Sequence, residues 1–311
     1  MAWQQVRRPK NSILYRMISS PKDAIGHVFQ QYRVLEFLGQ GGTGVCYRVQ
    51  HTTIGRELCL KLTYPLASQP QAILRAASRM VRALGAIDHP GVIKLHDFGV
   101  LEIEGDSTFY LGMDLLSRHT VASWSFENKL PIATILNTFA KIANALHASH
   151  TCRFFDETGF EQIGLLHGDI KPDNIMMTRF GEPVVTDFMM PDLHALIAYD
   201  ARERLPDVGG PLRLATTDMY GTRGYMPPEQ MHQGLVTVRS DIFSLGLTTV
   251  ETILRRYDEW DEMADVQTLI ELGIDDEFGT YLLRMMHPRP EERPSSMEEV
   301  ANRFSEFARR L

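Results

Sequence analysis

The hydrophobic pattern of the chain changes from short strand-like runs to longer helical ones. Residues 32–38 and 45–49 are rich in strand-forming side chains, and residues 58–62 form a short apolar run that contains Lys61. Farther along, apolar residues recur every three or four positions, as on one face of a helix. These positions are Ile73, Ala77, Met80, Val81, Leu84 and Ile87 in one stretch, and Ile135, Phe139, Ile142 and Leu146 in another.

A glycine-rich turn separates the first two predicted strands. Gly39, Gly41 and Gly44 have the spacing of a GxGxxG pattern, and Val45 follows them. Glycine permits close backbone approach, so main-chain amides can cover phosphates. A dinucleotide-binding version would lead into a helix. Strand-forming residues follow here instead, which favours a hairpin; a plain glycine hairpin without a ligand is the alternative.

A second polar stretch, residues 165–177, carries an acid, a cation and an amide between apolar flanks. These residues are Asp169, Lys171 and Asn174. Taken alone, they would also suit a polar turn between two buried strands. The stretch resembles the catalytic loop of eukaryotic-type (Hanks-type) serine/threonine protein kinases, and of bacterial members in particular, with Gly168 in place of the family's arginine.

Other motifs of that family follow in the family's order. The chain has counterparts of the lysine strand, the Asp-Phe-Gly segment with Met189 replacing glycine, the Pro-Glu segment, an aspartate-bearing helix and a late arginine. They lie at residues 58–62, 182–189, 221–230, 239–246 and 287–294. The resemblance implies an α+β fold, namely the two-lobed protein kinase fold, with a small β-rich N-lobe that has one helix and a larger helical C-lobe.

The same resemblance suggests a domain organisation. We expect a solvated N-terminal tail at residues 1–27, with a docking or regulatory arm as the alternative, and a kinase domain at 28–311. Within this domain, the expected N-lobe covers about 28–113, the hinge about 114–117 and the C-lobe about 118–311.

The resemblance also assigns catalytic roles to Asp169, Lys171 and Asn174. Asp169 would orient the substrate hydroxyl and accept its proton, and Lys171 would neutralise charge on the transferring phosphate. Asn174 and Asp187 would bind Mg²⁺, a hard cation that prefers oxygen ligands. Thr222 would bond near Asp169 and Lys171 and help to select Ser or Thr.

ATP is the expected phosphate donor. Lys61 would hold its α- and β-phosphates. Met113 would be the gatekeeper, and residues 114–116 would offer backbone groups to adenine. Cys59 stands where the family's alanine lines the adenine pocket, and we expect it to be a small buried apolar residue. The complete nucleotide-binding set is Gly39, Gly41, Gly44, Val45, Cys59, Lys61, Met113, Asp114, Leu116 and Met176.

Three structural supports are expected as well. Asp241 would brace the backbone of the catalytic loop, and Arg293 would form an ion pair with Glu229. Ser296 and Glu299 have the spacing of a capping box at the start of the last helix.

One departure from the family concerns the partner of Lys61. Counting back from His89, the family's helix glutamate falls on Met80, and residues 58–87 contain no acidic residue. Losing one preorganised contact would slow transfer by about 10²–10³. We therefore keep a nucleotide-binding pseudokinase that acts as a scaffold or allosteric regulator as an alternative. A small-molecule kinase is a further alternative, although that class lacks the segments at 221–230 and 239–246.

Composition limits the expected partners and the expected compartment of the protein. The net charge of −7 gives no nucleic-acid footprint, and no apolar run is long enough for a membrane span. The three cysteines form no CxxC pair, which is typical of a reducing, cytoplasmic compartment. The expected partner is a protein substrate or a regulatory protein.

Two local features stay open. His147 and His150, with Cys152 nearby, are compatible with a metal site, but histidines at a helix end are more common. Residues 151–164 are longer than the family's usual connection. We expect a surface excursion there, and a partner site is the alternative.

Overall fold

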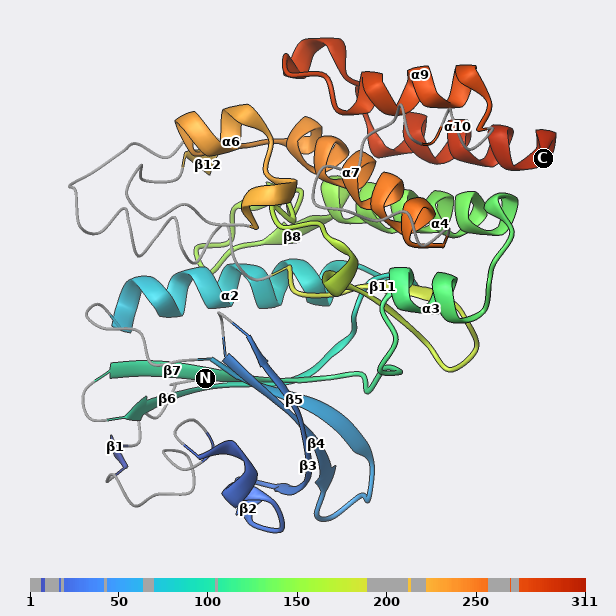
Figure 1. Cartoon of the computed structure of the whole chain (residues 1–311). Helices are drawn as coiled ribbons and strands as arrows, with labels where there is room; N and C mark the ends of the chain where they lie inside the picture. Colours follow the sequence, from blue (N-terminus) through green and yellow to red (C-terminus); the bar gives the residue numbers. More distant parts are fainter. Residues whose placement is uncertain are drawn as a thin grey trace. The chain divides into compact units, whose positions relative to one another are not determined.

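A computed structural model of the chain describes residues 7–8, 17, 20–41, 44–63, 70–103, 106–188, 212–213, 222–256, 269 and 274–311. The fold divides into two units. The first combines Met1–Arg75 with Ile93–Leu116, and the second combines Ala76–Val92 with Ser117–Leu311. Figure 1 labels their helices and strands.

The first unit is built around a seven-stranded sheet. β1 runs parallel to β6, and the other neighbouring strands are antiparallel. In sheet order the strands are β1 (Arg7–Arg8), β6 (Leu95–Ile103), β7 (Asp106–Met113), β5 (Glu57–Thr63), β4 (Gly44–His51), β3 (Tyr32–Gly41) and β2 (Val28–Phe29). The antiparallel pairing of β3 with β4 and of β4 with β5 confirms the three predicted strands and the glycine hairpin.

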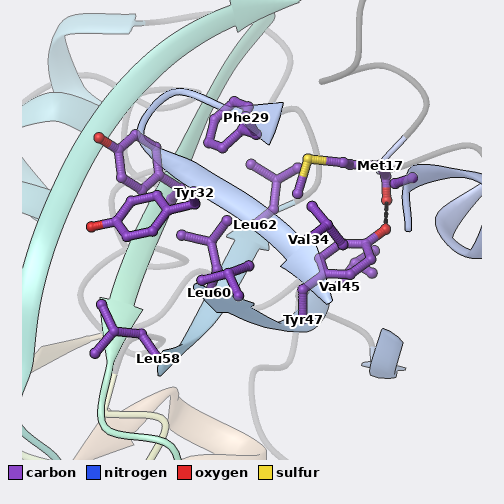
Figure 2. Close-up of a cluster of buried hydrophobic side chains, with 12 residues drawn as sticks. Met17, Phe29, Tyr32, Val34, Val45, Tyr47, Leu58, Leu60 and Leu62 are labelled. Carbon is purple, nitrogen blue, oxygen red and sulfur yellow. Dashed lines mark hydrogen bonds between the residues drawn. The ribbon is translucent and has the colours of Figure 1, made fainter. Parts of the chain in front are cut away.

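One face of β4 and β5 forms the core of this unit, because side chains alternate across a strand. Leu62 lies opposite Val45, and Leu60 lies opposite Tyr47. Figure 2 shows these side chains packed together. The buried cluster consists of Met17, Ala24, Phe29, Tyr32, Val34, Val45, Tyr47, Val49, Leu58, Leu60, Leu62 and Tyr110.

The N-terminal segment contributes to this core. The Met17 side chain is fully buried in the cluster, and its carbonyl accepts a hydrogen bond of 2.6 Å from the Tyr47 hydroxyl (Figure 2). A short 3₁₀ helix, η1 (Pro21–Ala24), follows and buries Ala24. The expectation of a solvated tail is therefore wrong for Met17 and Ala24, because both are packed in an apolar core.

The second unit is largely helical. α4 (Ile132–Thr151) packs against α10 (Met297–Arg310) and α7 (Val238–Arg256), as Figure 1 shows. The rings of Phe139 and Phe304 meet edge to face with centroids 6.4 Å apart. The other helices are α2 (Pro70–Ala86), whose residues from Ala76 onward belong to this unit, α3 (Val121–Glu127), α6 (Pro228–Gln233) and α9 (Asp276–Met285).

These helices and the sheet confirm the α+β prediction and both predicted amphipathic helices. Short elements complete the second unit. They are the strand pairs β8 (Arg153–Phe155) with β9 (Glu161–Ile163), β10 (Ile175–Met177) with β11 (Pro183–Val185), β12 (Leu212–Arg213) with β13 (Leu235–Val236), and the 3₁₀ helices η2 (Pro172–Asn174), η3 (Arg223–Tyr225) and η4 (Pro290–Glu292).

The excursion after α4 is the β8–β9 hairpin. The Asp156 carboxylate organises its turn by accepting hydrogen bonds from Thr158 and from the backbone nitrogen of Phe160. The hydrogen bond from the Thr158 hydroxyl is the main cause that lowers the pKa of Asp156 to about 2. Phe155 and Phe160 are 61% and 72% exposed, so the excursion lies at the surface of its unit.

The start of α10 differs in one detail from the predicted capping box. The Ser296 hydroxyl accepts a hydrogen bond of 3.2 Å from the backbone nitrogen of Glu299. The Glu299 carboxylate, however, accepts from the backbone nitrogen of Ser295, one residue upstream of the cap. The reciprocal half of the box is therefore displaced by one residue.

A buried ion pair connects α6 to the segment before α10. The two terminal nitrogens of Arg293 donate to the Glu229 carboxylate at 2.6 and 2.9 Å, which confirms the predicted pair. The Ser240 hydroxyl donates to the same carboxylate at 2.9 Å, and three backbone carbonyls accept from Arg293. The guanidinium is fully buried, and these acceptors satisfy it in place of water.

Within the described part of the chain, no helix combines the length and the apolar character that crossing a membrane requires.

The core position of Met17 gives a stability prediction. Met17→Ala should lower the free energy of unfolding by about 2–5 kcal/mol, because it removes buried methylenes and leaves a cavity. The matched control is Ile54→Ala in the same unit, where the side chain is 68% exposed, and its effect should stay within about 0.5 kcal/mol. Urea unfolding followed by circular dichroism measures both. Equal effects of the two substitutions would contradict the assignment of Met17 to the core.

The buried ion pair gives a second stability prediction. Arg293→Met should cost about 3–5 kcal/mol of unfolding free energy, because it leaves the Glu229 carboxylate buried without its cation. Arg153→Met is the control, since Arg153 is 67% exposed and pairs with Glu161 at the surface. That substitution should cost at most about 1 kcal/mol. If the two variants unfold at the same urea concentration, the buried pair does not contribute the predicted unfolding free energy.

Candidate active site

The predicted catalytic loop connects β9 to β10 in the second unit. Leu165, Ile170 and Ile175 are buried along it, while η2 carries the chain from Lys171 into β10. Asp169 lies between these anchors, and its side chain is 11% exposed. The apolar flanks seen in the sequence therefore hold a short polar loop at a fixed place.

Four donor groups surround the Asp169 carboxylate. Its Oδ1 accepts from the backbone nitrogen of Thr222 at 2.9 Å and from the Thr222 hydroxyl at 3.1 Å. Its Oδ2 lies 3.2 Å from Lys171 Nζ and accepts from Asn174 Nδ2 at 3.0 Å. Lys171 also donates to the Thr222 hydroxyl at 2.6 Å. The structure thus brings together the three predicted catalytic residues and Thr222.

Asp187 follows β11 and is fixed through its neighbours. The backbone nitrogen of Thr186 donates to the carbonyl of Asn174 at 2.9 Å, which ties this segment to the catalytic loop. The buried ring of Phe188 packs against His167 with centroids 4.9 Å apart. Asp187 itself has a φ of 65°, a left-handed conformation that is uncommon for a residue other than glycine. Such strained positions persist where the surroundings determine them, and they concentrate at functional sites.

The side chains of Asn174 and Asp187 fit a magnesium ion chemically. Asn174 Nδ2 donates to the carbonyl of Asp169 at 2.7 Å as well as to its carboxylate. The oxygen Oδ1 is therefore the atom that Asn174 can give to a cation. An amide oxygen and a carboxylate suit Mg²⁺, which takes few protein ligands and keeps several waters. The described residues contain no group of three or more His, Cys, Asp or Glu side chains placed to hold a metal.

Asp241 braces the backbone of the catalytic loop from the interior of the second unit, as predicted. Its fully buried carboxylate accepts from the backbone nitrogens of His167 at 3.0 Å and Gly168 at 2.8 Å. His150 Nε2 lies 2.7 Å from the same carboxylate. Burial alone would raise the pKa of Asp241, but the hydrogen bond and positive field of His150 outweigh it, so the pKa is lowered. A carboxylate is thus maintained beneath the loop.

This arrangement also assigns a structural role to one of the two histidines noted in the sequence. His150 is bound to Asp241 in the interior of the second unit. Burial raises the pKa of the nearby Cys152 thiol, which disfavours the thiolate that metals bind. The geometry therefore favours a helix-end histidine over a metal ligand at His150.

In the first unit, Lys61 lies on the face of the sheet opposite the apolar core. It is buried at 4% exposure and stands opposite Cys46 of β4. Cys59, two residues earlier on β5, shares this face. Val45 pairs instead with Leu62 inside the buried cluster. Val45 therefore lies on the core face, away from Lys61, and Cys46 shares the face of Lys61 instead, because a one-residue offset on a strand reverses the side.

The three glycines of the turn have different surroundings. A Cβ added to Gly44 would lie 2.2 Å from the carbonyl oxygen of Leu62, so only glycine allows β4 to approach β5 there. A Cβ added to Gly39 or Gly41 would meet no atom of the described residues within 4 Å. The backbone of the turn is thus open at two of its glycines. Residues 42 and 43 lie outside the described part of the chain.

The predicted gatekeeper, Met113, ends β7 and stands directly opposite Cys59. Both side chains are half-buried. Cys59 is therefore more accessible than the buried apolar residue that the sequence analysis expected. Met176, the remaining member of the nucleotide-binding set outside the sheet, is half-buried in the middle of β10 in the second unit.

Asp114 begins the predicted hinge and is held on two sides. Its backbone nitrogen donates to the carbonyl of Lys94 at 3.2 Å. Its carboxylate lies 2.6 Å from His96 Nε2 and 3.3 Å from a terminal nitrogen of Arg56. Leu116, two residues farther on, is half-buried. The side chain of Asp114 is thus held by contacts on β6 and near the start of β5.

Two of the predicted departures from the family concern Met80 and Met189. Met80 is buried in α2, at 3% exposure, and belongs to the second unit, whereas Lys61 belongs to the first. Met189, which stands where the family has glycine after Asp-Phe, lies outside the described residues.

Sequence reasoning missed one contact to the catalytic loop. Gln230 of α6 donates from Nε2 to the carbonyl of Gly168 at 2.8 Å, and its side chain is buried at 3% exposure. The only signal in the sequence is a glutamine directly after the Pro-Glu pair. Nothing in that pattern alone says which backbone group the glutamine reaches.

Comparison with known proteins agrees with this geometry. Residues 32–305 match the model of the protein kinase domain. The chain is 26% identical over 227 residues to the serine/threonine-protein kinase PrkC of Bacillus subtilis, covering 73% of this chain and 31% of that protein. It is 31% identical over 219 residues to the DNA damage-responsive serine/threonine-protein kinase RqkA of Deinococcus radiodurans, covering 70% and 28%. The chain thus spans less than a third of the length of these two relatives.

Solved structures show the same fold. The kinase domain of Mycobacterium tuberculosis PknI superposes with a TM-score of 0.59 at 22% identity, covering 91% of this chain and 98% of that domain. The apo form of PpkA-294 gives 0.61 at 20% identity, covering 90% and 98%. With the family model matching most of its length and the catalytic loop assembled as described, the chain belongs to the protein kinase family.

Proposed function

We propose that this domain transfers the γ-phosphate of ATP, with Mg²⁺, to serine or threonine hydroxyls of protein substrates. The observation that carries the proposal is the Asp169 carboxylate, held by Thr222 and Asn174 with the Lys171 ammonium 3.2 Å away. Relatives named as serine/threonine-protein kinases support the choice of hydroxyl.

The catalytic loop can perform the protein's part of this reaction. Asp169 would accept a hydrogen bond from the substrate hydroxyl, orient it and take its proton. Lys171 bridges Asp169 and Thr222, so its ammonium is positioned to neutralise negative charge on the transferring phosphoryl group. Thr222 holds both groups in one arrangement, which lowers the reorganisation that transfer requires.

The nucleotide and the metal would be bound by separate sets of residues. In the first unit, Lys61 would hold the α- and β-phosphates, the turn of Gly39, Gly41 and Gly44 would cover them with backbone amides, and the Asp114 carbonyl would accept from adenine. In the second unit, Asn174 and Asp187 would hold Mg²⁺, which neutralises charge on phosphate oxygens when bound.

The two alternatives have less support. A pseudokinase has no chemical need for the full set of Lys61, Asp169, Lys171, Asn174 and Asp187, and the curated relatives are named as kinases. A small-molecule kinase is disfavoured by the match to the protein kinase domain, which extends through residues 221–246. We infer a protein substrate or a regulatory protein as the partner. A cytoplasmic location would suit the three free cysteines.

The proposal predicts the effect of removing the carboxylate base. Asp169→Asn should lower transfer of labelled γ-phosphate to the protein itself or to a generic basic protein by about 10²–10⁴-fold, because an amide cannot accept the hydroxyl proton. Asp173→Asn is the matched control. This substitution also removes one carboxylate, but Asp173 lies four residues after Asp169 and its side chain is exposed. Transfer activity should therefore remain at the wild-type level.

Binding separates this proposal from the pseudokinase. Mg·ATP should raise the Tm of both the wild type and Asp169→Asn, since Asp169 is not assigned to nucleotide binding. Nucleotide-dependent stabilisation without transfer by the wild type would instead establish a pseudokinase.

The role of Thr222 gives a further prediction. Thr222→Val should lower kcat by about 10- to 100-fold, because it removes a hydroxyl that bonds to both Asp169 and Lys171. Thr222→Ser keeps the hydroxyl and should retain most activity. Steady-state kinetics on a protein substrate measures both variants. Equal kcat values for valine and serine at this position would show that the hydroxyl does not contribute.

A further inference from the structure

The peptide bond that precedes Asp169 begins at a glycine with an uncommon backbone conformation. Gly168 stands at a φ of 72°, in the left-handed region, where the family places an arginine. Glycine adopts positive and negative φ about equally well, so its own preference restrains this peptide poorly. The direction in which the Asp169 side chain leaves the loop depends on the orientation of this peptide. The hydrogen-bond partners of its two polar atoms therefore decide how it is held.

Both polar atoms of this peptide have partners. The carbonyl of Gly168 accepts from Gln230 Nε2 at 2.8 Å, and the backbone nitrogen of Asp169 donates to His167 Nδ1 at 3.2 Å. The bond from Gln230 is the shorter of the two and comes from a different element, α6. It is also buried, which strengthens it relative to a solvated bond.

Gln230 is itself held in place. The preceding residue, Glu229, carries the bidentate ion pair with Arg293 and the hydrogen bond from Ser240. Gly234, at a φ of 61°, ends α6 and donates from its backbone nitrogen to the carbonyl of Gln230. The glutamine amide is thus presented to Gly168 from a short helix that is anchored at one end by buried charge and closed at the other by a left-handed glycine.

We propose that Gln230 is a positioning residue for phosphoryl transfer: by holding the carbonyl of Gly168, it fixes the peptide that aims the Asp169 carboxylate. The inference rests on the proposed kinase activity. Gln230 touches no reacting atom in this account, and it acts only through the Gly168–Asp169 peptide. Its loss should therefore lower kcat and leave the binding of ATP unchanged, since the residues assigned to the nucleotide lie elsewhere.

Two substitutions of similar size test this inference. Gln230→Met removes the donor, and Gln230→Glu places an ionisable oxygen against the Gly168 carbonyl. Each should lower kcat by about 10- to 100-fold, since small misplacements of a reacting group have effects of this size. The KM for ATP should not change. Thr248→Ala is the control for losing a buried polar group, because the Thr248 hydroxyl bonds within α7 to the carbonyl of Ser244.

The readouts separate positioning from stability. Tm is measured for every variant, and kcat is compared at a temperature where each is fully folded. A reduced kcat for both Gln230 variants at unchanged KM, with wild-type kcat for Thr248→Ala, would support the proposal. Wild-type kcat in either folded Gln230 variant would overturn it. Absence of transfer by the wild type would overturn the proposed function itself, which the wild-type assay detects before any variant is compared.

Discussion

The catalytic loop depends on one buried carboxylate. The backbone nitrogens of His167 and Gly168 form buried hydrogen bonds, so both need an acceptor in the interior. A buried amide without an acceptor costs about 1–3 kcal/mol. Asp241 accepts from both nitrogens, and His150 supports its charge from α4. The interior therefore supplies a matched acceptor for the two buried amides of the catalytic loop.

The start of α7 serves two parts of the site at once. Asp241 binds the catalytic loop, while the neighbouring Ser240 binds Glu229, the residue that anchors α6 through Arg293. In α6, Gln230 then reaches the carbonyl of Gly168. Two adjacent residues of one helix thus connect the loop and the segment that packs against it. A perturbation of the buried Arg293 would be expected to reach Asp169 through this connection, although Arg293 has no contact with the reaction.

Sequence motifs predicted the polar group around Asp169, the brace at Asp241 and the Glu229–Arg293 pair, because each uses residue types whose chemistry is specific. The motifs failed where two neighbouring residues differ only in the face of the strand on which their side chains lie. Val45 and Cys46 are adjacent, and only the pairing of β4 with β5 shows that Cys46 shares the face of Lys61. Met17 could not be placed, since the apolar residues in its stretch, among them Ile13, Leu14 and Ile18, show no clean periodicity. Gln230 was missed because its partner is a backbone carbonyl, which carries no sequence signal.

The central claim is that the group assembled around Asp169 supports transfer to Ser or Thr even though residues 58–87 contain no acidic residue to pair with Lys61. Phosphoamino-acid analysis of a protein substrate after incubation with the domain and γ-labelled Mg·ATP tests it most directly. The account predicts label on phosphoserine and phosphothreonine, transferred at a rate that Asp169→Asn lowers by about 10²–10⁴-fold. Label on phosphotyrosine alone, or no label from a folded wild-type protein, would contradict it.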